Sequence, residues 1–492
     1  MQDDTQQQSG SSLSTSAAGD ANARSAHNRG GEMRHHGAAE LRGMNAPRSH
    51  FFEDGFFGRM FGLPPFNADP AKLRQLGDAG GPMDPGPDAA NNPDNPAGLA
   101  AGFTFLGQFI DHDITFDPTS ILERQTDPEA IANFRTPALE LDNMYGSGPG
   151  ASPHLYQSAD SAKLLISPDG IDLPRNQEGT ALLGDPRNDE NVIVSQVHLA
   201  MIKFHNAVVD IVRASPVPGR SVFEVAQEKV RWHYQWIVLN EFLPKTVGDS
   251  IVKDVVKNGR KFYKWRNEPF IPVEFAVAAY RFGHSQVRAA YRINLTIPAG
   301  LPIFAGRPAV PPAPRIDLSG GRPLVAADVV DMTRFFDVTP AGAAIKGKAI
   351  DTKISPPLLD LPMFSGTPDN PRSLATRNLL RHLTFGLPSG QAVAKKMKET
   401  PLTPAELVKV QPLGFDVETP LWYYVLAEAE VKGGGKTLGP VGGRIVAEVL
   451  YGLLEGDRMS FLRQNPEWQP DLGPKAGKFT MADLLKVAGV VA

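Results

Sequence analysis

An amide, two carboxylates and an imidazole lie close together in an otherwise apolar segment. They are Gln108, Asp111, His112 and Asp113, within the sequence GQFIDHDITF that begins at Gly107. Charged groups among aromatic and aliphatic neighbours cost several kcal/mol when buried, unless a metal, a cofactor or hydrogen bonds satisfy them. We therefore expect this cluster to mark a chemical site.

A second cluster, GDPRNDE, ends at Glu190, directly before a segment of helical periodicity. Its ordinary explanation is a helix start, with the acidic groups complementing the helix dipole and Arg187 solvated. A third cluster, YRFGH, places His284 among apolar residues. A lone helical histidine is more often a core residue than a ligand. Gly283 beside it nevertheless costs about 1 kcal/mol in a helix, which suggests that something bulky approaches the backbone.

The fourth cluster is RNLLR, from Arg377 to Arg381, with the sequence GLP closing the segment at Pro388. An amphipathic helix with a Gly-Pro stop would explain it without any chemistry.

Composition limits the chemistry that these clusters can do. The chain has 492 residues, is 41% hydrophobic and has a net charge of −4 without a strong basic stripe, so we expect a small-molecule partner and no nucleic acid. It contains no cysteine, which excludes disulfides, thiolate zinc sites, iron–sulfur clusters and cysteine-ligated haem. Any metal must be held by histidine and oxygen ligands.

The elements that must position the clusters are mainly helices. Apolar spacing predicts helices at 99–111, 191–214, 222–243, 274–291, 373–384, 421–431 and 440–464. Few short strands fit, one of them near 291–297, and no uninterrupted apolar run of about 18 residues predicts a membrane span. We expect a mainly α fold with one large domain over residues 48–492.

The first 47 residues are rich in Gln, Ser, Gly and Ala, and we expect them to form a disordered tail. They contain no hydrophobic segment that could direct secretion, so we expect either a cytoplasmic location or export by a route without such a signal.

Taken in order, the GQxxDHD, GDxRxxE and RxGH strings and the helix that runs from Asn378 to GLP resemble the animal-type haem peroxidases of the peroxidase–cyclooxygenase superfamily. The resemblance covers roughly residues 50–460. The lack of cysteine fits a bacterial-type member. The resemblance implies a large helical peroxidase domain that binds haem b. It also implies reduction of hydrogen peroxide and oxidation of halide, pseudohalide or small organic donors through an oxoferryl intermediate.

On the proximal side, the resemblance makes His284 the ligand of the haem iron. The side-chain oxygen of Asn378 would accept a hydrogen bond from its other ring nitrogen. Arg281 and Arg381 would pair with the haem propionates, since guanidinium groups bind carboxylates bidentately.

On the distal side, His112 resembles the base that moves the peroxide proton, and Arg187 the cation that stabilises developing negative charge. Gln108 resembles the residue that orients distal water or halide. Asp111 and Glu190 match the carboxylates that in several family members form ester bonds to haem methyl groups. A third, sulfonium bond is excluded because Asn191, rather than methionine, follows Glu190.

The resemblance also implies a structural calcium site. Alternate residues of an extended loop point the same way, and oxygen ligands suit calcium. The expected ligands are Asp113, Thr136, the carbonyl of Ala138, Glu140 and Asp142, the last two departing from the usual family residues.

Other functions remain open. A fatty-acid dioxygenase of the same superfamily would need a tyrosine near His284; the cyclooxygenase position is Arg281, and Tyr280 is one residue further out. A metal-dependent phosphohydrolase could use the His112–Asp113 pair together with other histidines, namely His198, His205 or His233. We interpret His198 and His205 as core or surface histidines. A haem protein without turnover is a third possibility, against which the presence of both His112 and Arg187 argues.

Overall fold

The first cluster lies on α4, a helix that runs from Gly102 to Ile114. The computed structural model describes residues 55–86, 96–116, 132–133, 135–297, 299–304, 315–339, 344–364, 366–367 and 370–492. The described residues from Gly55 to Ala492 belong to one compact unit. The tail predicted over residues 1–47 lies outside the described part, so its boundary with the domain stays a prediction.

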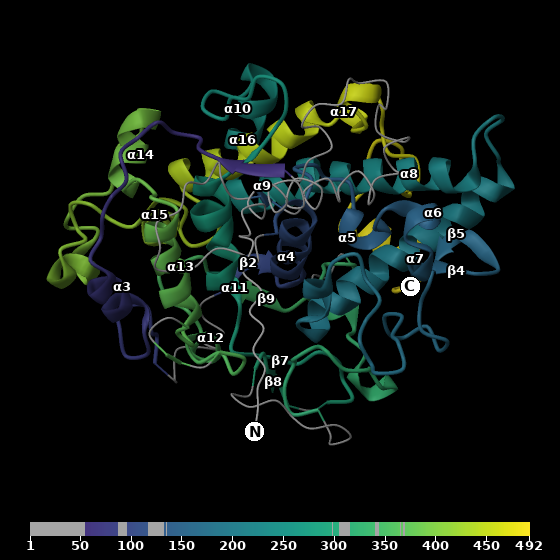
Figure 1. Ribbon diagram of the computed structural model, residues 1–492, viewed down its shortest axis with the longest axis horizontal. Helices are drawn as coiled ribbons and strands as arrows, with labels where there is room; N and C mark the ends of the chain where they lie inside the picture. The colour runs from purple at the N-terminus through teal and green to yellow at the C-terminus, as the bar shows by residue number, and fades with distance from the viewer. Residues whose placement is uncertain are drawn as a thin grey trace, which may run out of the picture. The chain divides into compact units, whose positions relative to one another are not determined.

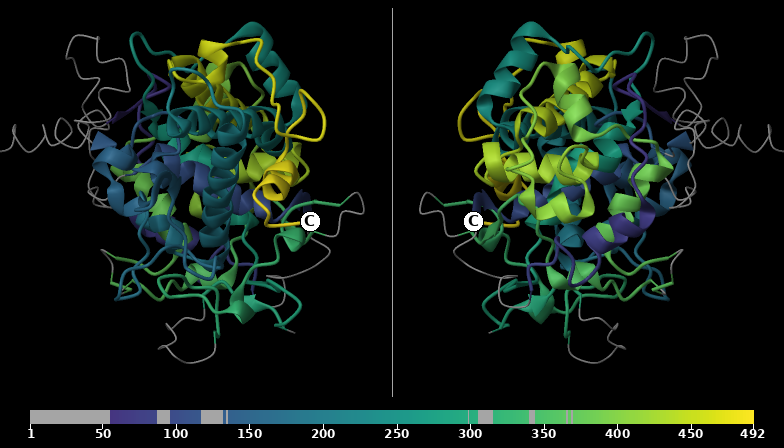
Figure 2. Two further views of the ribbon diagram at one scale, coloured as in Figure 1. Left: turned by 90° about the vertical axis from the view of Figure 1, so that its right-hand side faces the viewer. Right: turned by 90° about the vertical axis from the view of Figure 1, so that its left-hand side faces the viewer.

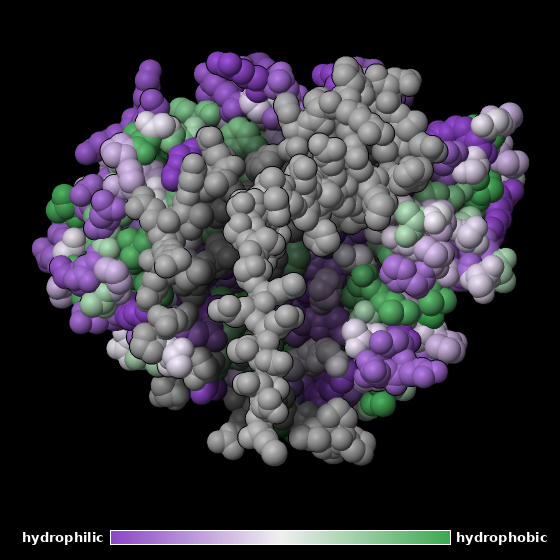
Figure 3. All heavy atoms as spheres, viewed as in Figure 1, coloured by the Kyte–Doolittle hydropathy of each residue, from purple (hydrophilic) through white to green (hydrophobic). Residues whose placement is uncertain are grey.

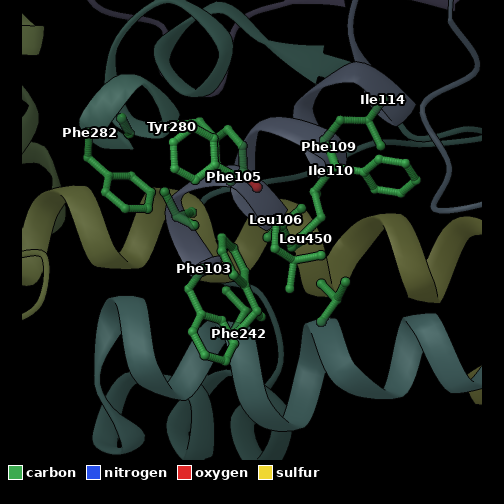
Figure 4. Close-up of a cluster of buried hydrophobic side chains, with 14 of the residues drawn as sticks. Phe103, Phe105, Leu106, Phe109, Ile110, Ile114, Phe242, Tyr280, Phe282 and Leu450 are labelled. Carbon is green, nitrogen blue, oxygen red and sulfur yellow. The ribbon is translucent and has the colours of Figure 1, made fainter. Parts of the chain in front are cut away.

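Apolar side chains at helical spacing bury α4. Phe103, Leu106 and Ile110 are all at most 3% exposed. Figure 4 shows Phe103 and Leu106 directed toward Phe242 and Leu450. Phe242 ends the π-helical segment Val238–Phe242, and Leu450 belongs to α16 (Pro440–Gly456). This packing leaves the polar residues of α4 to the other sides of the helix.

Two long helices, α7 (Val192–Ala214) and α8 (Val222–Ile237), pack against each other, and α7 also packs against α4 (Figure 1). Asn191 caps α7 by accepting a hydrogen bond from the backbone N–H of Val194 at 2.9 Å. Among the described residues, α7 alone has the length and composition to cross a membrane. However, 83% of its most apolar window is buried in the protein, as expected for a core helix.

The predicted helix at 274–291 is wrong as a continuous element. A π-helical turn covers Glu274–Ala278, a 3-10 turn covers Ala279–Phe282, and α11 covers only Gly283–Gln286. Glu274 is fully buried and accepts hydrogen bonds from the backbone N–H groups of Met60 and Phe61. The segment follows these contacts rather than one regular helical repeat, and α11 presents His284.

The other predicted helices are present with shifted ends. They are α13 (Leu374–Thr384), α15 (Leu421–Lys432) and α16, which stops at Gly456 and is followed by the separate short helix α17 (Phe461–Gln464). After α8 and the π-helical segment, α9 covers Leu243–Val247. Helices that the apolar pattern did not predict are α3 (Pro70–Gly77), α10 (Asp249–Asn258), α14 (Gly390–Met397) and α18 (Met481–Val487). The very short helices are α5 (Asp142–Tyr145), α6 (Gly148–Ala151) and α12 (Pro356–Leu359).

Strands are few and short, as predicted. A three-stranded sheet has the order β3 (Ala132–Asn133), β1 (Gly55–Gly58), β6 (Ile271–Pro272), in which β1 is antiparallel to β3 and parallel to β6. Three antiparallel pairs join β2 (Pro96–Ala100) to β9 (Lys346–Lys348), β4 (Tyr156–Gln157) to β5 (Asp160–Leu164), and β7 (Ala290–Tyr291) to β8 (Leu301–Pro302). The strand predicted at 291–297 is therefore reduced to β7.

The views from two further sides also show a helical body with short strands (Figure 2). On the face of Figure 3, hydrophobic residues form separate patches among hydrophilic ones over the part that the structure describes. The apolar side chains are gathered mainly in the core between the helices, where they surround α4 and α7.

Candidate functional site

His112 is held through its ring by a buried asparagine. Its Nδ1 atom lies 2.8 Å from Oδ1 of Asn188, and Nδ2 of Asn188 lies 2.9 Å from Nδ1 of His198. All three side chains are buried. Burial, and next the charge of Arg187, lower the pKa of His112 to about 3, so the imidazole is neutral at ordinary pH. No hydrogen bond from its Nε2 atom to a described residue is present.

Gln108 and Asp111 lie on the same side of α4 but have different partners. Gln108 donates a short hydrogen bond from Nε2 to Oε1 of Glu190, and its Oε1 accepts from Asn191 at 3.2 Å. Asp111 accepts from the hydroxyl of Thr115 at 3.0 Å. The structure thus brings Gln108 to Glu190 and the start of α7.

Arg187 forms hydrogen bonds with nearby side-chain and backbone groups. Its Nε and Nη2 atoms donate to the carboxylate of Asp185, and Nη2 also donates to the carbonyl of Thr115. Its guanidinium lies 4.7 Å from the ring centre of Phe116. Its charge still acts on its neighbours, since it lowers the pKa of His112 and opposes the raised pKa values of Asp111 and Glu190. The predicted distal cation therefore lies beside the predicted distal residues.

Asp185 joins two arginines in the interior. It is 0% exposed, and it accepts from Arg135 at 2.7 Å as well as from Arg187 at 2.8 Å. Burial alone would raise its pKa, but the hydrogen bond and charge of Arg187, together with the charge of Arg135, lower it to about 2. Asp185 is therefore ionised and holds Arg187 in place.

A second ion-pair group holds the loop from the other side. Arg175 donates to Asp189 at 2.6 Å and to Asp172 at 2.8 Å, and all three side chains are at most 9% exposed. Gly320 packs so close that a Cβ atom there would lie 1.7 Å from the carbonyl oxygen of Asp189. The loop that carries Arg187, Asn188 and Glu190 is thus fixed by buried contacts on both sides.

The proximal residues meet between α11 and α13. Nδ2 of Asn378 lies 2.7 Å from Nδ1 of His284, and Oδ1 of Asn378 accepts from Arg281 at 2.7 Å. The pairing of His284 with Asn378 matches the expectation. The amide is turned with its nitrogen toward the ring, however, because the guanidinium of Arg281 takes its oxygen. Burial, and next the charge of Arg281, lower the pKa of His284 to about 3.

The two sides of the site lie near each other. The hydroxyl of Tyr280 donates to the carbonyl of Gly107 at 3.2 Å, which joins the segment before His284 to α4. The charge of Arg281 lowers the pKa of His284 and opposes the raised pKa of Asp111. Side chains predicted from opposite ends of the sequence therefore border one region.

Two carboxyl groups and the backbone of Gly283 lie in that region. The side chain of Glu190 is exposed. The pKa of its carboxyl group is nevertheless raised to about 7, mainly because protein surrounds the group. Asp111 is partly accessible, and burial raises its pKa too. A Cβ atom on Gly283 would meet no atom within 4 Å, so the backbone beside His284 borders open space.

Arg381 lies on α13, one helical turn after Arg377, and is half-buried. Its charge contributes, after burial, to the lowered pKa of Arg377, whose guanidinium lies 3.6 Å from the ring centre of Phe364. The structure places Arg381 one turn from Asn378 on the same helix.

The predicted calcium residues form an acidic group around the far side of α4. Asp113 is fully buried, its Oδ2 accepts from Tyr234 at 3.2 Å, and its Oδ1 makes no well-formed hydrogen bond to a described residue. Burial, then the charge of Asp142, and further that of Glu140, raise its pKa well above the ordinary value. Leu141, between the two other carboxylates, has a left-handed backbone (φ 64°), which is strained for a branched residue.

The remaining predicted ligands lie in the same segment: Ala138 is buried, and its N–H donates to the carbonyl of Thr136 at 2.8 Å. Yet among the described residues no three His, Asp or Glu side chains are arranged closely enough to hold a metal ion. The calcium ligand set stays a prediction.

The histidines suggested for a phosphohydrolase site do not gather around His112 and Asp113. His205 bonds to the hydroxyl of Tyr145 at 2.9 Å and to the carbonyl of Ala162, and His233 packs against Trp468 and Phe479. Both are core histidines; the sequence interpretation covered His205 but not His233. His198 is buried as well, but its link to Asn188 was not predicted.

Several residues of the site escaped prediction. Asn188, Asp185 and Asp189 lie inside the recognised GDPRNDE string, but nothing in the sequence shows which side chain turns toward His112 and which toward Arg135 or Arg175. Arg135 and Arg175 come from loops without periodicity. The polar composition of the string is the one signal that could have pointed to these pairs.

Residues 123–300 match the family model described as animal haem peroxidase. Heme peroxidase 2 of Caenorhabditis elegans is 28% identical over 247 residues, which make up 37% of this chain and 34% of that protein. Peroxidasin of Drosophila melanogaster is 24% identical over 335 residues, 64% of this chain and 21% of that protein. The matched stretches thus span 34% and 21% of these relatives' length.

Solved structures share the fold. Peroxidase A from Dictyostelium discoideum superposes with a TM-score of 0.61 at 18% identity, covering 84% of this chain and 89% of that chain. A fatty acid alpha-dioxygenase from Arabidopsis thaliana superposes with a TM-score of 0.55 at 16% identity, covering 84% and 74%. At these identities the likeness concerns the fold alone.

The mainly helical fold is similar to those of the solved peroxidase and dioxygenase structures, and in this chain it holds two histidines that are each bound to an asparagine. Over residues 123–300 the chain is similar to the animal haem peroxidase family. A bacterial-type branch stays a prediction.

Proposed function

We propose that this protein is a haem peroxidase, which reduces hydrogen peroxide and oxidises a halide, a pseudohalide or a small organic donor. The observation that carries the proposal is the pair of histidines on α4 and α11, of which His112 is buried and His284 is partly buried. Each is bound through Nδ1 to an asparagine, and neither forms a hydrogen bond from Nε2 to a described residue. Two such ring nitrogens suit one axial ligand and one proton acceptor.

The residues fit haem on structural grounds. The open space at Gly283 leaves room beside His284, and the side chains of Glu190 and Asp111 are accessible rather than packed in the core. His284 would hold the iron, with Arg281 and Arg381 pairing with propionates. When bound, haem supplies the iron that accepts peroxide and the redox chemistry that splits its O–O bond.

The distal residues handle the proton and the charge. His112 is neutral because burial and Arg187 lower its pKa to about 3, so its Nε2 atom can take the proton of peroxide and return it to the leaving oxygen. Arg187 stabilises the negative charge that develops on oxygen, and Asp185 keeps it there. Gln108 orients water or halide, and its bond to Glu190 keeps it at that side of α4.

On the proximal side, iron ligation through Nε2 of His284 requires a proton on Nδ1. That proton needs an acceptor, which is the oxygen of Asn378. Because Arg281 holds this oxygen in the structure, we infer that Arg281 releases it when it pairs with a propionate, and that the amide then turns.

Two further features are proposed on the same basis. Asp111 and Glu190 would form ester bonds to the haem once peroxide is supplied; the accessibility of their side chains supports this. Calcium would bind at Asp113, with Thr136, the carbonyl of Ala138, Glu140 and Asp142. The burial of the Asp113 carboxylate and the charges of Asp142 and Glu140 beside it support a cation site there.

The test is to load the full chain with haem and measure peroxide-dependent oxidation of bromide, thiocyanate and a phenol. We expect oxidation of at least one donor, and a loss of about 10²-fold or more in His112→Gln. His205→Phe, a buried histidine with other partners, is the matched control and should retain activity. Oxygen consumption with a fatty acid, but no peroxide-dependent oxidation, would instead favour the dioxygenase.

A further inference from the structure

The imidazole of His112 has one hydrogen-bonding partner among the described residues, the amide of Asn188. Arg187 contacts His112 only at the backbone carbonyl, at 3.4 Å, and does not hold the ring. Asn188 and His198 are 0% exposed and His112 is 5% exposed, so water does not compete for these bonds.

The donor and acceptor atoms fix the direction of the two hydrogen bonds that join His112, Asn188 and His198. An amide oxygen can only accept, so Nδ1 of His112 must carry its proton to bond Oδ1 of Asn188 at 2.8 Å. An amide nitrogen can only donate, so Nδ1 of His198 must be unprotonated to accept from Nδ2 at 2.9 Å. The Nε2 atom of His112 is then left with a lone pair.

The side chain of His198 and the backbone that carries Asn188 are both held in place by their neighbours. The ring of Phe109 meets the ring of His198 edge-on, with centroids 5.6 Å apart, and His198 lies in the interior of α7. Asn188 lies in the 3-10 turn Pro186–Asp189, which Arg175 fixes through Asp189. The asparagine is therefore held from both sides.

We infer that Asn188, itself oriented by His198, is a positioning residue that sets the tautomer and the ring orientation of His112. The consequence for peroxide, a correctly aimed proton acceptor, rests on the proposed function. The direction of the hydrogen bonds does not depend on the proposed function.

The first experiment measures cyanide association with the haem-loaded full chain. Hydrogen cyanide must give up a proton to bind iron, so its association rate reports the distal base without turnover. Asn188→Leu keeps the approximate shape of the side chain but removes both hydrogen bonds, and it should slow association by about 10- to 100-fold with an unchanged Soret band. Asn188→Asp keeps an acceptor for Nδ1–H of His112 and should recover most of the rate.

Matched controls separate positioning from general loss of packing. His198→Phe should give a partial loss, because Asn188 keeps His112 but loses its own anchor. His205→Phe removes a buried hydrogen bond elsewhere on α7 and should leave the rate unchanged. Wild-type rates in Asn188→Leu, or equal losses in Asn188→Leu and Asn188→Asp, would overturn the inference.

The second experiment is done on the wild-type chain, and a single variant is used only to assign the signal. Nitrogen NMR of histidine-labelled full chain, in the diamagnetic ferrous carbonyl form, reports which ring nitrogen of His112 is protonated, with His112→Gln assigning the signal. We expect the proton on Nδ1 of His112 and on Nε2 of His198; a proton on Nε2 of His112 would overturn the inference. If the chain binds no haem, the proposed function fails, and the same spectrum of the purified chain still decides the tautomer.

Discussion

Replacing Asp185 with asparagine should destabilise the protein in a pH-dependent way. Asp185 is fully buried between Arg135 and Arg187, and its pKa falls from the ordinary 3.8 to about 2. Each pKa unit corresponds to about 1.4 kcal/mol, so the ionised carboxylate contributes about 2 kcal/mol at neutral pH. In Asp185→Asn, Arg135 keeps Asp142 at 3.2 Å, whereas Arg187, whose side chain is 24% exposed, loses its carboxylate partner, so we expect a total loss of about 2 to 3 kcal/mol.

The sign of the pH dependence follows from the lowered pKa. The contribution is complete above pH 4 and is lost as the pH falls toward about 2, so roughly half should remain at pH 3. The assay is urea unfolding of the full chain and of Asp185→Asn at several pH values between 7 and 3. Asp210→Asn is the control: its carboxylate pairs with Lys163 at the surface and should cost less than about 0.5 kcal/mol.

An Asp185→Asn variant as stable as the wild type at pH 7 would refute the ion-pair reasoning. A loss that stays constant from pH 7 to pH 3 would refute the assigned pKa.

Three further predictions concern the site. Arg187→Ala should keep haem and slow the reaction with peroxide by about 10²- to 10³-fold in stopped-flow measurements; an unchanged rate would count against its role. After peroxide treatment, acidified organic solvent should leave haem attached to the wild type and release it from a double variant, Asp111→Asn with Glu190→Gln. Fully extractable wild-type haem would rule out the ester bonds. Calcium added after chelation should raise the thermal midpoint of the full chain. At a calcium concentration of 100 times the Kd, the free energy of unfolding should rise by about 2.7 kcal/mol, and Asp113→Asn should abolish this increase. An equal midpoint with and without calcium would contradict the site.

The sequence predicted the parts of the site that depend on residue type. His112, Glu190, His284 and Asn378 were recognised because their motifs occur in order, and α4, α7 and α13 because apolar spacing marks a buried helix face. The identity and order of these residues can be read from the sequence without knowledge of their contacts.

The parts that the sequence predicted wrongly or did not address depend on contacts between distant segments. The broken helix before His284 follows from the buried carboxylate of Glu274, which binds backbone groups more than 200 residues earlier. The turned amide of Asn378 follows from competition by Arg281, and the tautomer of His112 follows from Asn188. No periodicity within one segment contains this information.

The central claim is that His284 holds the haem iron and His112 faces it. Resonance Raman spectroscopy of the ferrous haem-loaded protein tests this most directly, because the iron–histidine stretching band identifies the axial ligand. The band should be present in the wild type and in His112→Ala and absent in His284→Ala. A band that persists in His284→Ala and disappears in His112→Ala would contradict the assignment of the two sides.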